Sequence, residues 1–351
     1  MIALGLDIGG ANLKGATSTG IAKSEPFEIW RAPGQLATRL RSLIAQFPPS
    51  DLLAITMTAE LADCFSSKAE GVAAIIAAVV QAAGPTSIAI WETTGRFTSP
   101  ENAVLRPLTF AASNWQALAT WAGRLAPAGK GLLLDIGSTT TDIIPLQDGI
   151  PVARGATDLA RLLNHELVYT GIRRTPLCAV AGTVTVRDQP CPVAAELFAT
   201  TLDVFLLLGM IPEDADDRNT ADGQPATIPC AHNRMARMVC CDRDEIDLAE
   251  ARSIAKCFFE AQKRPLSAAV DAVVARDTGR LETVIISGSG VPLVRTILTE
   301  NRTTRDARQV SLADTLSPEL AEAACAYAVA VLAVEATGEG RMTSDNRIHH
   351  A

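Results

Sequence analysis

A strand, a glycine turn and a second strand are encoded twice in this chain, and this repeat limits the fold more than any other feature. The first copy, LDIGGANLK, runs from Leu6 to Lys14, and the second, LDIGSTTTD, runs from Leu134 to Asp142. In each copy an apolar run ends at an aspartate, and the small residues after it let the backbone approach a ligand closely. The repeat predicts two related lobes, which suits a chain that is long for a single core.

Strand and helix patterns alternate after each copy of the repeat. Helical patterns separate strand patterns along the chain, an order typical of α/β layers. The expected strands lie at residues 2–7, 13–17 and 21–30, and the same meander returns at 132–135, 142–146 and 150–154. We therefore expect an α/β protein with two lobes around a central cleft. Its predicted parts are a first lobe at residues 1–128, a second lobe at 129–338 and a tail at 339–351.

Caps and prolines predict several helix boundaries. Ser113 to Gln116 has the residues of a capping box, and Ser317-Pro318 has the order of an N-cap and a first helical residue before the closing helix. An apolar helix is expected from about residue 193 to 208. Pro265 is expected to end or kink a long helix that begins near residue 244.

Charge and cysteine usage limit the expected partners and compartment. The formal net charge of −8 argues against a general nucleic-acid binder. Eight cysteines are scattered without a regular framework, so reduced thiols in a cytoplasmic protein are expected. The N-terminus lacks signal-peptide features, and the apolar run at 72–83 is too short to span a bilayer. We expect a cytoplasmic protein without nucleic-acid or membrane partners, and a homo-oligomer is compatible with the sequence.

Three glycine-containing turns after strands are suited to phosphate binding. They are the two hairpin loops and the Ser-Gly-Ser-Gly turn that follows the strand pattern at 283–286. Backbone N–H groups in such turns point at phosphate oxygens, and Asp7, Asp135 or Asp142 could hold hydrated Mg²⁺. Lys14 and Asp142 each have a second interpretation, as charges on a hairpin surface or strand edge. The predicted phosphate-binding residues are Gly9, Gly10, Asn12, Lys14, Gly137, Ser138, Thr139, Thr140, Gly288, Ser289 and Gly290.

These turns resemble those of the superfamily of sugar kinases, actin and heat-shock chaperone ATPases, and within it the hydantoinase A/oxoprolinase branch. Two further segments, TMTAELADC at Thr56–Cys64 and YTGIRRTP at Tyr169–Pro176, are similar to the family linked to tetrahydromethanopterin-dependent one-carbon transfer. Archaeal members of that family are methanofuran-biosynthesis enzymes. The likeness runs from residue 2 to about residue 335. It implies a two-lobed actin-like, ribonuclease H-like ATPase fold with duplicated phosphate hairpins.

The resemblance implies a transferase that forms an ether. Members of that family join an aminomethylfuran-methyl diphosphate to the phenol of a glutamyl-tyramine unit and release diphosphate. A tyrosine-derived phenol is a second acceptor class for this chain. Asp7 and Asp135 are then the catalytic candidates, because with Asp142 they would hold Mg²⁺ against the diphosphate. ATP could bind to the same loops, but the implied reaction does not require it.

Charged residues in the two specific segments are candidates for the remaining roles. Glu60 and Asp63 follow a strand end, where open α/β sheets place their sites, and are the candidate bases for the phenol. They could instead form a solvated helix cap. Arg173 and Arg174 are candidates for binding a substrate carboxylate or phosphate, against the alternative of solvent-facing charges.

Two other functions fit the same loops. One is an ATP-dependent small-molecule kinase or hydantoinase-like ATPase. The other is a nucleotide-binding regulatory or assembly protein of the actin-like type, without turnover. Motif geometry does not separate these functions from ether synthesis, but their products do. Ether synthesis releases diphosphate without using ATP, a kinase forms ADP, and a regulatory protein forms no product.

Overall fold

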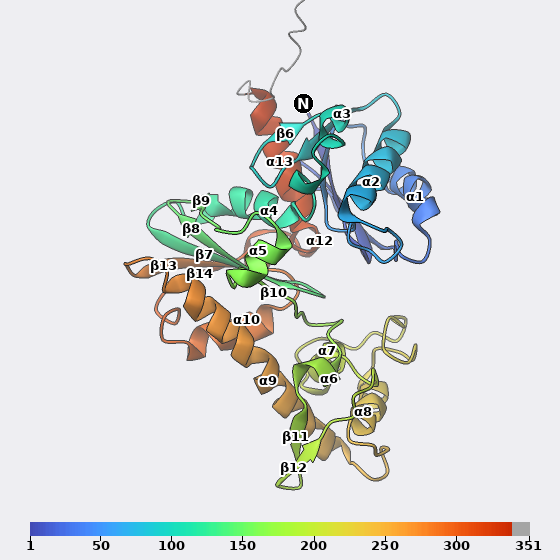
Figure 1. Cartoon of the computed structure of the whole chain (residues 1–351), viewed down its shortest axis with the longest axis vertical. Helices are drawn as coiled ribbons and strands as arrows, with labels where there is room; N and C mark the ends of the chain where they lie inside the picture. Colours follow the sequence, from blue (N-terminus) through green and yellow to red (C-terminus); the bar gives the residue numbers. More distant parts are fainter. Residues whose placement is uncertain (339–351) are drawn as a thin grey trace, which may run out of the picture.

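The computed structural model describes residues 1–338, which form two main sheets with helices packed on them (Figure 1). The predicted tail at 339–351 lies outside the described residues. The first sheet has the strand order β3-β2-β1-β4-β5-β6, in which β1, β4 and β5 are parallel and β2 and β3 complete the antiparallel meander. Its strands are β1 Ala3–Ile8, β2 Asn12–Thr17, β3 Ala22–Pro26, β4 Leu52–Met57, β5 Ser87–Trp91 and β6 Phe97–Thr98.

The second sheet repeats this arrangement. Its order is β10-β8-β7-β13-β14, with β9 also paired to β8. β7 pairs antiparallel with β8 and parallel with β13, as β1 does with β2 and β4. The duplicated meander predicted from the sequence is therefore confirmed, although its last strand, expected at 150–154, covers only Ile150–Pro151. The strands are β7 Lys130–Ile136, β8 Thr141–Gln147, β9 Ile150–Pro151, β10 Leu167–Val168, β13 Leu281–Ser287 and β14 Arg308–Ser311.

Helices pack on both sheets and between them. The α-helices are α1 Leu36–Ile44, α2 Lys68–Ala83, α3 Pro100–Ala103, α4 Asn114–Ala122, α5 Asp158–Leu163, α6 Leu177–Val180, α7 Thr201–Leu207, α8 Ile228–Arg237, α9 Leu248–Val274, α10 Val291–Glu300, α11 Leu312–Thr315, α12 Pro318–Glu322 and α13 Ala324–Gly338. Short 3-10 helices cover Pro33–Gln35, Pro107–Thr109 and Gly123–Leu125. No helix in this described part combines the length and apolar character that a bilayer crossing requires.

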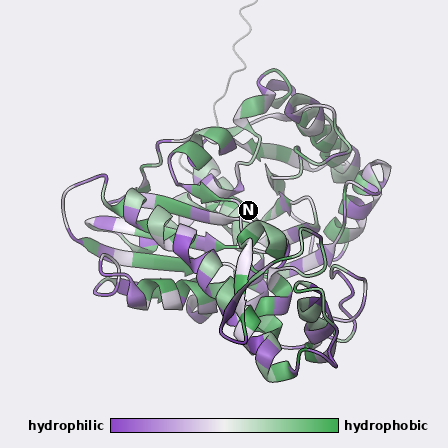
Figure 2. Ribbon diagram, turned by 60° about the horizontal axis from the view of Figure 1, so that its bottom comes forward, coloured by the Kyte–Doolittle hydropathy of each residue, from purple (hydrophilic) through white to green (hydrophobic). Residues whose placement is uncertain are grey.

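The buried side chains divide the protein into layers. α1 and α2 pack on one face of the first sheet, where Leu4 and Leu6 are buried. α4 and α13 fill the space between the sheets, in one apolar cluster that joins Ala54 of β4 to Leu133 of β7. α9 and α10 cover the far face of the second sheet. Figure 2 shows hydrophobic colours along the strands and more hydrophilic colours in many loops.

A separate group of elements extends from the second sheet at the bottom of Figure 1. It consists of α6, α7, α8, the hairpin of β11 (Thr183–Val186) and β12 (Gln189–Pro192), and the first half of α9. A buried ion pair between Arg234 of α8 and Asp203 of α7, at 2.7 Å, joins two of its helices. Asp203 also completes a capping box with Thr200, so one carboxylate starts α7 and neutralises the arginine.

Several local predictions were wrong. The expected helix at 193–208 is shorter, because α7 begins only at Thr201, and the expected strand at 21–30 ends at Pro26. Pro265 does not end α9: its side chain is exposed, so the missing N–H bond falls on the solvent side while Gln262 and Leu266 stay buried.

The capping box predicted at Ser113 is absent. Ser113 has helical angles (φ −92°, ψ −5°), and its hydroxyl lies 3.0 Å from Thr56 Oγ1 of β4 instead of capping α4. The cap predicted at Ser317 is confirmed, since its side chain accepts a bond from Leu320 N. That cap begins the short helix α12, and the closing helix α13 starts afterwards at Ala324.

The closing helix α13 crosses the first sheet although it follows the second in sequence. It packs on β1, β2 and β4 and against α4. Gly5 makes this possible, because a Cβ at that position would overlap the Ala326 carbonyl oxygen of α13. The lobe boundary near residue 128 stays a prediction. The last helix, α13, packs in the apolar cluster that contains residues of both sheets.

Replacing Gly5 tests this close helix–strand contact. We expect Gly5→Ala to lower the free energy of unfolding by about 1–3 kcal/mol, because the new methyl group forces α13 away from β1. Gly34→Ala is the matched control, since no atom lies within 4 Å of a Cβ built there. Urea unfolding of both variants measures the difference, and equal stability would contradict the packing described here.

Candidate active site between the two sheets

The two hairpins have equivalent geometry. Gly9 N donates to Asn12 O at 3.0 Å, and Gly137 N donates to Thr140 O at 2.9 Å, so each loop closes by the same bond. Asp7 stands opposite Lys14 in the first hairpin, and Asp135 stands opposite Asp142 in the second. The repeat therefore places one aspartate at the same point of each hairpin. The residue across from it is positively charged in the first hairpin and negatively charged in the second.

The alternation of strand residues directs both aspartates to the same layer. On β1, Leu4, Leu6 and Ile8 face α1 and α2, so Asp7 shares the other face with Gly5, which contacts α13. On β7, Leu133 belongs to the cluster between the sheets, and Asp135 shares its face. The two carboxylates consequently lie on the sides of the sheets that face each other.

The electrostatics of these carboxylates agree with that placement. Burial raises the pKa of Asp7 to about 6, partly offset by Lys14. Burial raises the pKa of Asp135 to about 7, with further increases from Asp142 and Asp7, while Lys14 and a hydrogen bond from Ser287 lower it. Asp7 Oδ1 has no hydrogen-bond partner among the described residues. Two buried carboxylates that repel each other, one of them with an oxygen that no donor reaches, are suited to a cation.

Lys14 and α13 complete this group. Lys14 Nζ donates to Glu322 O at 2.7 Å, at the junction of α12 and α13. The thiol of Cys325, in the first turn of α13, has a pKa raised well above its usual value by burial and then by Asp7 and Asp135. The start of α13 therefore lies next to both aspartates.

Asp142 is held by an arginine that the sequence did not single out. Arg161 of α5 lies 2.6 Å from Asp142 Oδ1 and is almost fully buried. Its guanidinium stacks 4.4 Å from the ring centroid of Trp115 on α4. Asp142 is thus neutralised inside the protein, and its predicted role in metal binding stays a prediction. Single charged residues in short helices carry no sequence signal that would have identified Arg161.

The Ser287–Gly290 turn joins the second hairpin. Ser287 is paired with Asp135 across β13 and β7, and Gly290 N donates to Ile136 O at 2.9 Å. Gly288 has φ +82°, and a Cβ there would lie 2.5 Å from Asp135 Oδ1. Only glycine fits this position, so the turn lies directly beside the aspartate.

The Tyr169–Pro176 segment is hydrogen-bonded to the loop of the second hairpin. The N–H groups of Arg173 and Arg174 both donate to Ser138 O at 3.0 Å, and Ile172 N donates to Gly137 O at 3.1 Å. A Cβ on Gly171 would lie 2.5 Å from Gly137 O and Thr139 N. The glycine of this segment is therefore required by its close contact with the second hairpin loop.

The two predicted substrate-binding arginines already have protein partners. Arg173 forms an ion pair with Asp217, and Arg174 stacks 4.8 Å from the ring centroid of Trp30. Trp30 follows Ile29, whose N–H donates to Gly10 O at 3.0 Å. The Arg174–Trp30 contact therefore connects the surroundings of the two hairpin loops. A role of these arginines in substrate binding stays a prediction.

Glu60 and Asp63 differ sharply in environment. Glu60 is only 1% exposed, and its Oε2 has no hydrogen-bond partner in the part of the chain that is described. Burial raises its pKa to about 7; Asp158 also raises it, while backbone hydrogen bonds and Lys68 lower it. Ala112, which donates one of those bonds, has an unusual φ of +49°. Asp63 is exposed, so Glu60 is the better candidate for a base.

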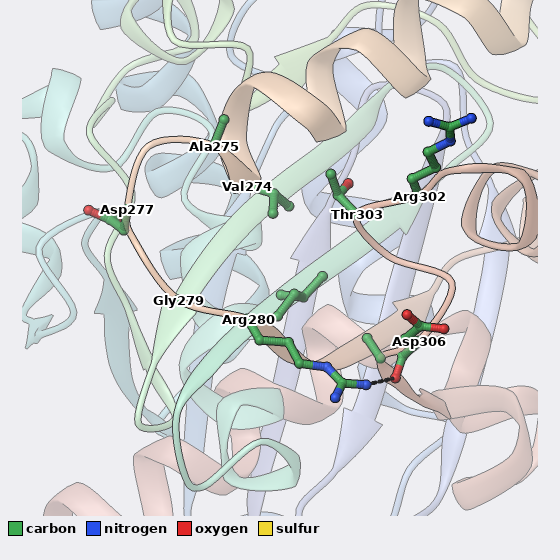
Figure 3. A pocket seen from close by; sticks show the side chains of 10 residues that line it. Val274, Ala275, Asp277, Gly279, Arg280, Arg302, Thr303 and Asp306 are labelled. Carbon is green, nitrogen blue, oxygen red and sulfur yellow. Dashed lines mark hydrogen bonds between the residues drawn. The ribbon is translucent and has the colours of Figure 1, made fainter.

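Two surface pockets lie away from these residues. The one in Figure 3 has a volume of about 550 Å³ and is lined by Arg280, Arg302 and Asp306, where Arg280 donates to Asp306 O. It lies at the first residue of β13, whereas Ser287 is the last, roughly 20 Å away at the usual strand rise. The second, about 660 Å³, is lined by Glu92, Arg96 and Arg106. Neither pocket contains a predicted site residue.

The donor set fits a hard cation bound together with phosphate. Within residues 1–338, no group of three or more His, Cys, Asp or Glu side chains could hold a metal ion by itself. Asp7 and Asp135 nevertheless face one layer, and the Asp7 oxygen without a donor is buried. Mg²⁺ is usually held by one or two carboxylates with water and substrate phosphates supplying the rest, so these two residues fit it.

Comparisons with known proteins give the relationships of this chain. A hydantoinase/oxoprolinase family model matches residues 51–336. The (4-{4-[2-(gamma-L-glutamylamino)ethyl]phenoxymethyl}furan-2-yl)methanamine synthase of Methanocaldococcus jannaschii is 32% identical over 332 residues, covering 94% of this chain and 96% of the relative. A Methanococcus vannielii protein of the same name is 32% identical over 203 residues, covering 57% of this chain and 89% of the relative.

Among solved structures, nucleotide-free acetone carboxylase is similar to this chain. The match has a TM-score of 0.56 at 10% identity and covers 93% of this chain and 70% of that protein. At this identity the likeness concerns the fold alone.

Proposed function

Because the chain belongs to the hydantoinase/oxoprolinase family and has an actin-like ATPase fold, we propose that it is an ether-forming transferase. Its proposed substrates are a furanylmethyl diphosphate and a phenol, and its products are an aryl furanylmethyl ether and diphosphate. The enzymes it resembles are named synthases, and the product in their name contains a phenoxymethyl group on a furan. That linkage is the bond such a synthase would form.

The observation that carries this proposal is the equivalent placement of Asp7 and Asp135 in the two hairpins. Both carboxylates come from equivalent hairpins, face one layer and have raised pKa values. Turns with this geometry suit phosphate groups, and a diphosphate that departs needs the same stabilisation as one that is transferred. Asp7 and Asp135 would hold Mg²⁺, which when bound supplies positive charge against the leaving diphosphate.

Glu60 is the proposed base. Its carboxylate takes the proton from the phenol, and the phenol oxygen forms a bond to the furanylmethyl carbon. The bond from that carbon to the diphosphate oxygen breaks, and the diphosphate leaves with the electron pair. An electron-rich furan shares the positive charge that develops at the reacting carbon. A pKa of about 7 suits this role, because a base works best when its pKa is near the working pH.

Mass spectrometry of a simple incubation tests the reaction. Purified protein is mixed with a furanylmethyl diphosphate, a phenol such as tyramine or its glutamyl derivative, and Mg²⁺. We expect the ether and one equivalent of diphosphate, without ATP. ADP formation with a small-molecule acceptor would instead favour a kinase. ATP binding without any product would favour a regulatory protein of the actin-like type.

Glu60→Gln separates stability from activity. Burial raises the pKa of the Glu60 carboxyl from 4.5, its value in the unfolded chain, to about 7 in the folded protein. The folded protein therefore loses stability as the pH rises from 4.5 to about 7, and the loss is complete above pH 7. Glu60→Gln removes this loss. We therefore expect the variant to be more stable than the native protein at pH 8.5, on the order of 2 kcal/mol, and nearly equal near pH 4.5.

The same variant should lose most of its activity. Without a base, kcat should fall by roughly 10²–10⁴-fold. Asp63→Asn is the matched control, because Asp63 lies in the same segment and is exposed. This substitution should leave the stability and kcat nearly unchanged. Unfolding curves at the two pH values and steady-state rates give the readouts. An active Glu60→Gln protein would remove Glu60 from the proposed mechanism.

A further inference from the structure

Lys68 and Asp158 form an ion pair between parts of the chain that are 90 residues apart. Lys68 Nζ lies 2.7 Å from Asp158 Oδ2, and about a quarter of each side chain is exposed. Lys68 is the first residue of α2, on the first sheet, and Asp158 is the first residue of α5, which follows the second meander. The pair therefore connects the starts of two helices from the two predicted lobes.

Local helix chemistry explains Asp158 but does not explain Lys68. An acidic residue in the first turn of α5 interacts favourably with the helix dipole, whereas a lysine at the start of α2 opposes it. Both helix starts already have side-chain caps, from Ser67 and Thr157, so neither needs the ion pair to form. A residue that conflicts with its local structure indicates a tertiary role.

The tertiary role of Lys68 concerns Glu60. The first turn of α2 packs closely on Glu60, because a Cβ on Gly71 would overlap the Glu60 backbone. Asp158 and Lys68 are the charged groups that act on the Glu60 carboxyl, in opposite directions. Glu70, also in the first turn of α2, accepts a bond from Ser66 N at 2.9 Å instead.

We propose that the Lys68–Asp158 ion pair is a closing contact between the two lobes that completes the surroundings of Glu60. Lys68 and Asp158 are then positioning residues, and the lobe that carries α5 contributes to the base only when the two helix starts meet. This inference rests on the proposed function for its link to catalysis. The contact itself and its effect on Glu60 are independent of the reaction.

Carbon-13 NMR of the Glu60 carboxyl group tests the contact without substrate. Glutamate-labelled protein is titrated from pH 4.5 to 9, and the Glu60 signal is identified by its loss in Glu60→Gln. We expect Asp158→Asn to shift the Glu60 titration to lower pH, because a negative neighbour is removed, and Lys68→Met to shift it to higher pH. Lys256→Met and Asp188→Asn, which alter exposed charges elsewhere, should not move it.

The sign of these shifts decides the inference. Opposite shifts in the two variants support it, since general loosening of the protein would move Glu60 in one direction in both. Shifts in the same direction, or none, overturn it. The exchanged pair Lys68→Glu with Asp158→Lys keeps the contact and covers the case in which a single variant unfolds. It should melt near the native temperature, and melting below both single variants would overturn the contact.

Kinetics then connect the contact to the reaction. Each single variant should lower kcat by roughly 10- to 100-fold with little change in KM for the diphosphate, and the exchanged pair should recover part of the loss. If the NMR shifts appear but Glu60→Gln remains active, the closing contact stands and the proposed base fails. If Glu60→Gln is inactive but neither single variant changes the titration or kcat, the inference fails and the proposed function stands.

Discussion

Asp7→Asn and Asp135→Asn are each expected to lower kcat for ether formation by at least about 10³-fold while leaving the fold intact. The amide keeps the shape of the side chain but removes the charge that would hold Mg²⁺ against the diphosphate. Because the two residues occupy equivalent positions of the two hairpins, we expect similar losses from both. Steady-state rates measured by diphosphate release give the comparison.

Stability measurements distinguish a lost ligand from a damaged fold. Burial raises the pKa of Asp135 to about 7, so its ionisation costs native stability as the pH rises from 3.8 to 7. Asp135→Asn should therefore melt at or above the native temperature at pH 8 in the absence of Mg²⁺. Asp188→Asn, on the exposed turn between β11 and β12, is the control for both assays. Near-native turnover in either site variant would rule out the proposed diphosphate site.

Gly171→Ala is expected to have the next largest effect. Its methyl group would lie 2.5 Å from Gly137 O and Thr139 N, and backbone atoms of a tight hairpin cannot move aside cheaply. We expect a loss of about 2–3 kcal/mol in unfolding free energy and roughly a 100-fold loss in kcat, because the second hairpin loop is displaced. Urea unfolding and turnover of the same preparation measure the two effects.

A second glycine provides the matched control for this variant. A Cβ at Gly182 would meet no atom within 4 Å, so Gly182→Ala should behave like the native protein. If Gly171→Ala were as stable and active as Gly182→Ala, the Tyr169–Pro176 segment would not support the hairpin in the way its hydrogen bonds to Ser138 indicate.

The duplicated hairpins could be predicted because their signals are local. Apolar runs with a period of two, an aspartate at the strand end and a glycine turn specify strand, face and loop within nine residues. The expectation that Asp7 and Asp135 are equivalent followed directly, and the register of both hairpins agrees with it. The family was also recognisable from the Thr56–Cys64 and Tyr169–Pro176 segments, and the comparisons confirm that family for the chain as a whole.

Other local patterns were misleading where a distant residue competed for the same group. Ser113 has the sequence context of a cap, yet its hydroxyl contacts Thr56, which lies 57 residues earlier. Pro265 normally stops a helix, but the buried residues around it hold α9 together. In both cases tertiary contacts outweighed a preference worth only about 1–3 kcal/mol.

Most strands, the glycine turns and the acidic residues after them could be predicted from the amino-acid sequence, since each depends on neighbours a few positions away. Which carboxyl groups have a shifted pKa depends instead on the tertiary fold. Glu60 is buried and its pKa is influenced by both Lys68 and Asp158, whereas Asp63, three residues later, is exposed. Burial and charge–charge interactions come from elements far apart in the chain, and these set the pKa of a carboxyl group.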